Sequence, residues 1–170
     1  SNLWNTKRSE TLELIHPYDI DLSDQELASE IRSINPSLSE AIAHDICHEG
    51  TAEVEIIDKK NGSCDASEAA KLLLLSSLSA TAGAVNGLRD FEIYDFLQHP
   101  GRDLSGLKAR VLDELDIRAW YLHRSQDGRL FFKNQQNLAA RLRSTAEGLH
   151  NESVSKELRK FLKERFEPSI

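Results

Sequence analysis

Six polar side chains, on a predicted helix and around the turn that follows it, are of types that bind the phosphates of DNA. They are Arg102, Ser105, Lys108, Arg110, Arg124 and Arg129. Cations neutralise phosphates and hydroxyls hydrogen-bond to them, and phosphate contacts supply much of the affinity of DNA-binding proteins. The same helix turns acidic at Asp113, Glu114 and Asp116, where phosphates would be repelled. These residues therefore leave two hypotheses, contact with DNA and contact with another protein.

A second group of side chains has the chemistry of a zinc site. His44, Cys47 and His48 are spaced i, i+3 and i+4 in a predicted helix, so they would lie on one face, and Cys64 could supply a fourth ligand. The paired short spacings of common zinc motifs are missing. A surface histidine pair beside a half-buried thiol explains the same residues, and we expect no metal site.

Two near-matches to catalytic motifs fail on inspection. Gly101 to Gly106 has the glycine spacing of a phosphate loop, but Leu107 stands where the lysine should be. Ser105 and Lys108 match a Ser–Lys nucleophile pair without its companion motifs. We therefore expect that the chain is not an enzyme and binds no cofactor of its own.

The elements expected to position the candidate DNA contacts are a helix and a β-hairpin. Apolar residues recur at three- and four-residue spacing from Leu104 to Leu115, which predicts one buried helix face. Two short apolar runs follow, at 120–122 and 130–132, and Asp127-Gly128 between them is a turn pair typical of hairpins. With the helices before it, this pattern predicts a winged helix-turn-helix in a mainly helical, α+β chain.

Three segments are expected along the chain. Residues 1–64 would form a short strand, at 11–15, and helices; residues 65–134 the winged helix-turn-helix; and residues 135–170 two C-terminal helices packed on it, the second at 153–166. The four leucines at 72–75 predict that the first helix of the middle segment is buried on most sides.

Helix starts are predicted from capping residues. Ser23, Ser37 and Asp65 are each followed three positions later by glutamate, the signature of a capping box. Asp90 and Asp103 are expected to cap two further helices. Residues 51–58 fit either a strand or a polar helix.

Composition bounds the class of protein. The 170 residues carry a formal net charge of −7 and two cysteines. Two cysteines do not make a disulfide framework, so we expect the protein to be located in the reducing cytoplasm. No apolar run approaches the roughly 18 residues of a membrane helix, so we expect no membrane partner. Residues 1–66 hold 5 basic and 14 acidic side chains, and residues 100–133 hold 7 and 5, so the winged segment is only slightly basic. The absence of methionine predicts a piece of a longer protein.

Several stretches resemble a family of large bacterial and archaeal AAA-type ATPases that are often encoded in phage-defence gene clusters and whose activity is uncharacterised. The stretches are HPYDIDL, INPSLSEAIAHDI, SSLSATAGAVNGL and PGRDLSGLKARVLDELDIRAWYLHRSQDGRLFFKNQQNLAARL. The resemblance implies a region beyond the nucleotide-binding core, in which residues 1–64 act as a lid and a winged helix follows. ATP and magnesium are implied for the parent protein only, because its phosphate loop is not in this sequence.

The leading hypothesis is a non-catalytic winged-helix region of such an ATPase, which docks protein or DNA and couples it to nucleotide state. Its expected partners are the ATPase core, DNA and other defence-system proteins. The alternative is a protein-interaction or self-assembly module without a nucleic-acid role, motivated by the acidic first third of the chain. A third hypothesis, an independent DNA-binding regulator, is disfavoured by the missing methionine.

Overall fold

A computed structural model describes residues 14–81, 83–148, 155–156 and 159–160. The strand predicted at 11–15 and the helix predicted at 153–166 lie largely outside these residues. The described elements are η3 (Pro17–Asp19), α1 (Gln25–Ile34), η4 (Pro36–Leu38), α2 (Ser39–Ala41), η5 (Ile42–Ile46), α3 (Glu53–Asn61), α4 (Asp65–Ser76), α5 (Asp90–Leu97), η6 (Lys108–Leu112), α6 (Asp113–Arg118), β1 (Leu122–Arg124), β2 (Leu130–Phe132) and α7 (Leu138–Gly148). The predominance of helix with one small antiparallel sheet confirms the mainly helical, α+β prediction.

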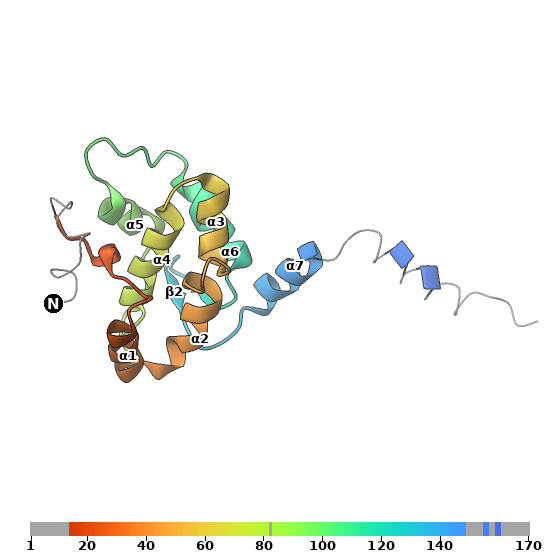
Figure 1. Ribbon diagram of the computed structural model, residues 1–170, viewed down its shortest axis with the longest axis horizontal. Helices are drawn as coiled ribbons and strands as arrows, with labels where there is room; N and C mark the ends of the chain where they lie inside the picture. Colours follow the sequence, from red (N-terminus) through yellow and green to blue (C-terminus); the bar gives the residue numbers. More distant parts are fainter. Residues whose placement is uncertain (1–13, 82, 149–154, 157–158, 161–170) are drawn as a thin grey trace, which may run out of the picture.

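Helix α4 lies at the centre of the body (Figure 1). The side chains of Leu72, Leu73 and Leu74 are all buried, because neighbours cover this helix on most sides. It packs against η3, η5 and α3 from the first part of the chain, and against α5, η6 and β2 from the later part. The predicted burial of this helix is confirmed.

The helices before α4 begin and end at other residues than those predicted. Asp24, not Ser23, caps α1, because its carboxylate accepts the backbone N–H groups of Glu26 and Leu27. The helix predicted to begin at Ser37 is present as a continuous helical stretch made of the 3-10 turn η4, the α-helix α2 and the π-helix η5, and it ends at Ile46, before Gly50. Residues 53–58 of the ambiguous stretch at 51–58 are helical and belong to α3, and Ala52 is the N-cap of that helix.

Long-range contacts also change how α4 and α5 begin. The carboxylate of Asp58, on α3, accepts the N–H groups of Ala66 and Ser67 at 2.8 and 3.0 Å and so caps α4. Asp65 and Asp90, which were expected to be caps, lie inside their helices and pair with arginine or lysine instead. A carboxylate near the start of a helix can form an ion pair with a cation that the fold brings close. Another acceptor then receives the free N–H groups of the first helical turn.

The predicted hairpin is confirmed. Leu122 pairs with Phe132 and Arg124 with Leu130 in antiparallel register, and Gly128 in the turn has a φ of 84°. Beyond β2, Leu88 forms an isolated antiparallel bridge to Leu130, with backbone hydrogen bonds of 3.0 and 2.8 Å. Gly87 makes this approach feasible, because a Cβ atom there would lie 2.2 Å from the carbonyl oxygen of Leu130.

The apolar face predicted from Leu104 to Leu115 is buried, although the helix starts later than expected. Leu104 lies before the helix, and Asp103 accepts the N–H of Ser105 in a local turn instead of capping a helix. The buried positions continue at Leu107, the N-cap of η6, at Val111 in η6 and at Leu115 in α6.

One hydrophobic core joins the two segments that were expected to meet at residue 64. It contains Tyr18, Ile46 and Ile57 from the first segment together with Leu73 and Phe132 from the second. Helix α7 is different: its first turns pack on α6, and it projects from the body (Figure 1).

Candidate functional site

The surface formed by α5, η6, α6 and the hairpin carries most of the predicted DNA contacts. Lys108 and Arg124 reach the same carboxylate, that of Asp90, and each lies 3.2 Å from one of its oxygens. The guanidinium of Arg124 also contacts Asp116 at 3.1 Å. Burial pushes the pKa of Arg124 down, but the hydrogen bonds to Asp116 and Asp90 outweigh it and the pKa is raised. Two of the candidate cations are therefore already compensated by carboxylates of the same chain.

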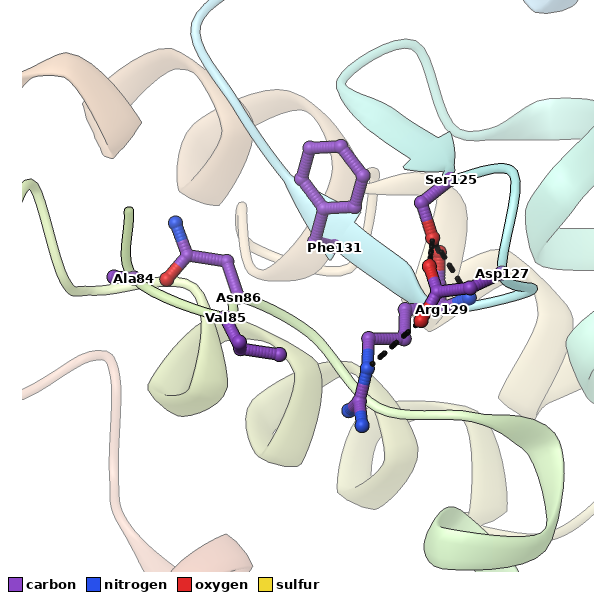
Figure 2. A pocket seen from close by; sticks show the side chains of 7 residues that line it. All are labelled: Ala84, Val85, Asn86, Ser125, Asp127, Arg129 and Phe131. Atoms are coloured by element: carbon purple, nitrogen blue, oxygen red, sulfur yellow. Dashed lines mark hydrogen bonds and ion pairs between the residues drawn. The ribbon is translucent and has the colours of Figure 1, made fainter. Parts of the chain in front are cut away.

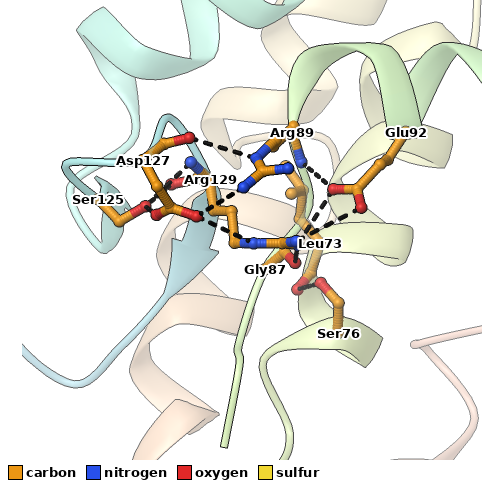
Figure 3. Close-up of polar contacts among 8 residues, drawn as sticks. All are labelled: Leu73, Ser76, Gly87, Arg89, Glu92, Ser125, Asp127 and Arg129. Atoms are coloured by element: carbon orange, nitrogen blue, oxygen red, sulfur yellow. Dashed lines mark hydrogen bonds and ion pairs between the residues drawn. The ribbon is translucent and has the colours of Figure 1, made fainter.

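Arg129 is held in the same way beside the turn of the hairpin (Figure 3). Its guanidinium donates to the carbonyl oxygen of Gly87 at 2.9 Å and contacts Glu92 at 3.0 Å and Asp127 at 3.3 Å. Arg89 contacts Asp127 from the other side at 3.2 Å, and its backbone N–H donates to Glu92 at 2.7 Å. These contacts tie the turn of the hairpin to the start of α5.

Arg102 is enclosed between the start of α4 and the end of α5. Its guanidinium pairs with Asp65, contacts Glu68 at 2.7 Å and donates to the carbonyl oxygen of Leu97 at 3.2 Å. Its side chain is only 12% exposed. Burial acts to lower the pKa of Arg102, but the hydrogen bonds to Asp65 and Glu68 more than offset this effect. The pKa is therefore raised above its ordinary value, and the arginine remains charged. Through these contacts Arg102 links α4 to α5, which accounts for the arginine without a ligand.

The remaining predicted contacts, Ser105 and Arg110, are exposed. The guanidinium of Arg110 lies over Gly106, where a Cβ atom would be within 2.2 Å of it. The pKa of the Asp103 carboxyl is lowered, first by the hydrogen bonds from Ser105 and also by the charge of Arg110. Of the six predicted DNA contacts, these two keep the greatest access to solvent together with Lys108. DNA contact at all six stays a prediction.

The four candidate zinc ligands have different surroundings. The Nδ1 atom of His44 lies 2.7 Å from the carboxylate of Asp45, and burial raises the pKa of the Cys47 thiol, with a further contribution from Glu55. The backbone of His48 donates to Glu55, and Cys64 is exposed just before α4. Among the residues the structure describes, no three His, Cys, Asp or Glu side chains are grouped so that they could hold a metal ion.

Asp45 is an important polar residue that sequence reasoning missed. It is fully buried, and its two carboxylate oxygens accept the backbone N–H groups of Trp120 and Tyr121 at 2.9 and 2.7 Å. The imidazole of His44 stacks on the Trp120 ring at 4.0 Å, and Arg141 of α7 lies 5.3 Å from the centre of that ring. Burial raises the pKa of Asp45 although its hydrogen bonds act in the opposite direction. The only signal in the sequence is an aspartate placed between apolar residues of a short helix.

An open hollow of about 390 Å³ lies between the loop before α5 and the turn and second strand of the hairpin (Figure 2). Val85 and Phe131 line one part of it, and Asp127 and Arg129 line another. Because Arg129 is already paired with carboxylates, the hollow offers apolar contact and hydrogen bonds more readily than a free charge. Ser125, also in the lining, donates its hydroxyl to the carboxylate of Asp127 at 2.5 Å, and both side chains therefore belong to the network that holds the turn of the hairpin.

No family model, no curated protein and no solved structure matches this chain. The described residues contain no helix that is both long enough and apolar enough to span a bilayer.

Proposed function

We propose that this chain is a non-catalytic winged-helix region whose role is to dock protein. A winged helix-turn-helix consists of a helix, a short strand, two more helices and a hairpin whose last strand pairs with the first strand. The order α4, Leu88, α5, η6 with α6, β1 and β2 agrees with this arrangement, and the bridge from Leu88 to Leu130 supplies the pairing.

The observation that carries the docking proposal is the internal compensation of the cations. Lys108, Arg124 and Arg129 each contact a carboxylate of α5, and Arg102 contacts two of α4. A DNA phosphate would have to compete with these carboxylates for the cations, and the further carboxylates on α6 would repel it. A protein partner can use the same surface, because protein interfaces accept mixed charge and apolar contact.

The resemblance to AAA-type ATPases supports a particular partner. The nucleotide-binding core of the parent protein would bind ATP and magnesium, and this region would dock on that core or on a further defence-system protein and respond to nucleotide state. In a longer protein that contains such a core, hydrogen exchange of α5, α6 and the hairpin should differ between an ATP analogue and ADP. Equal exchange in both states would contradict the coupling.

A matched pair of substitutions on α5 tests whether DNA is excluded by compensation. Asp90→Asn removes the carboxylate shared by Lys108 and Arg124, whereas Asp95→Asn makes the same change of formal charge at an exposed position of the same helix. We expect weak, unsaturated binding of a labelled DNA duplex by the wild type at low salt, measured by fluorescence anisotropy. Asp90→Asn should increase the affinity about twofold to fivefold, in a salt-dependent manner, and Asp95→Asn should change it less.

The contrary result is equally clear. Tight, saturable binding of the duplex by the wild type, lost in Lys108→Gln and Arg110→Gln but kept in Lys59→Gln on α3, would make DNA the ligand of this surface. The three positions are exposed, so their substitutions should leave the fold intact, which circular dichroism checks.

A further inference from the structure

We propose that copies of this chain associate head to tail, with the outer face of α7 in one copy packed on the outer face of α5 in the next. The α7 face is defined by Leu138 and Leu142, and the α5 face is the outer surface of that helix, which Phe91 and Phe96 flank about 140° apart. This inference goes beyond the proposed function, since it requires neither an ATPase core nor DNA.

The α7 face is apolar, exposed and held in position. Leu138 and Leu142 are four residues apart, so they lie on one side of the helix, and they are 68% and 71% exposed. On another side of α7, Ala140 is buried and Arg141 lies over the ring of Trp120. A helix that is anchored before it meets a partner loses little conformational freedom on binding.

The α5 face offers aromatic area to such a helix. Phe91 and Phe96 are 56% and 50% exposed, although Ile93 and Leu97 of the same helix are fully buried. Each half-exposed phenylalanine leaves a large apolar area hydrated, and a partner that covers both would remove this area from water. Aromatic side chains are enriched where proteins bind one another.

Charge selects this pairing over a symmetric pairing of two α7 helices. Arg143 is exposed at the edge of the α7 face, one position after Leu142, and Asp95 is exposed on the outer surface of α5 between Phe91 and Phe96. Packing α7 on α5 of the next copy brings opposite charges to one interface, whereas packing α7 on α7 would bring arginines together. Figure 1 shows α5 and α7 on opposite sides of the body, so both faces of one copy can be occupied only by other copies.

Sedimentation velocity of the full chain over a range of concentrations tests the proposal. We expect the weight-average mass of the wild type to rise with concentration. Replacing both leucines (Leu138→Ser with Leu142→Ser) or both phenylalanines (Phe91→Ser with Phe96→Ser) should weaken association at least about tenfold. Ile34→Ser, at a 58% exposed isoleucine of α1, is the matched control and should associate as the wild type does.

Mixing the two double variants separates head-to-tail from symmetric pairing. Each keeps one intact face, so the mixture should form a heterodimer and stop there, although neither variant associates alone. Reversing one charge, by Asp95→Arg or Arg143→Asp, should weaken association about twofold to fivefold, and combining the two reversals should restore it. A wild type that stays monomeric, a phenylalanine variant that associates normally, or a mixture that does not pair would each overturn the proposal.

Discussion

At the scale of single residues, the carboxylate of Asp45 shows how much one buried group can organise. It accepts two backbone N–H groups from residues 75 and 76 positions further along the chain and contacts the imidazole of His44. These hydrogen bonds hold the start of the hairpin against η5, in a region where Trp120 also meets α7. A buried carboxylate is costly unless it is well bonded, and here its bonds satisfy backbone groups that would otherwise be orphaned.

Asp45→Ala should therefore destabilise the fold by about 2 to 4 kcal/mol, because it leaves the N–H groups of Trp120 and Tyr121 buried without an acceptor. Urea unfolding followed by circular dichroism measures the loss. Asp113→Ala, at an exposed aspartate of α6, is the control and should cost less than about 1 kcal/mol. Equal losses in the two variants would show that Asp45 does not have this role.

The pH dependence of Asp45→Asn provides a second reading of the same site. Burial raises the folded-state pKa of Asp45 above its unfolded value, so the protonated form favours folding. The free energy of unfolding of the wild type, minus that of the variant, should be greatest below the unfolded pKa of about 3.9 and decrease as pH rises through the folded pKa. A difference that increases over this range would mean that the hydrogen bonds outweigh burial.

At the scale of elements, the isolated bridge between Leu88 and Leu130 depends on a glycine. Gly87 has a φ of 84° and lies against the backbone of β2, so both its conformation and the space around it exclude a side chain. The bridge it permits connects the loop before α5 to the sheet, and Arg129 reinforces the connection through the Gly87 carbonyl oxygen. The contact between this loop and β2 is thus made possible by one residue without a Cβ atom.

Gly87→Ala should cost about 2 kcal/mol or more of unfolding free energy, because the new Cβ atom would push Leu88 away from Leu130. Gly128→Ala isolates the conformational part of the cost: its φ is also 84°, but no atom lies within 4 Å of the position of its Cβ. That control should cost about 1 kcal/mol. Thermal unfolding of the two variants gives the comparison, and equal losses would place the whole effect in backbone strain.

At the scale of the whole molecule, the described part of the first 64 residues and the residues that follow form one packed unit. The side chains of Val54 and Ile57 are buried in the same core as those of Leu73 and Leu115. Ion pairs cross the same boundary, at 3.1 Å between Lys60 and Glu114 and at 2.9 Å between Arg118 and Glu53. A lid that moved as an independent body would have to open this core.

A chain of residues 65–148 should therefore fail to fold, because removal of the first segment exposes the buried face of α4. A chain of residues 14–148 should keep the cooperative unfolding transition of the full sequence. Circular dichroism and the dispersion of amide resonances distinguish the two outcomes. A well-folded 65–148 chain would show that the winged-helix segment is stable alone and that the shared core is dispensable.

Much of the local structure was predictable from the sequence. The four consecutive leucines at 72–75 predict that α4 is buried on most sides, and the pair Asp127-Gly128 between apolar runs predicts the hairpin. Helix starts were less predictable: Ser23 and Asp65 carry the capping signature, but Asp24 and Asp58 make the hydrogen bonds. Capping by Asp58 depends on the packing of α3 on α4, which no short window of sequence contains.

The sequence by itself therefore determined the periodic and turn-forming features, because these depend on neighbours within a few positions along the chain. The tertiary structure alone decided what the charged residues do. Lys108 and Arg124 have the chemistry of phosphate contacts, but the fold places both beside Asp90, which lies 18 and 34 positions away in the sequence. The interaction between two charges depends on their distance in space. The cations in a sequence therefore indicate which side chains could bind phosphate, and only the carboxylates beside them in the fold show how much positive charge is left for a partner.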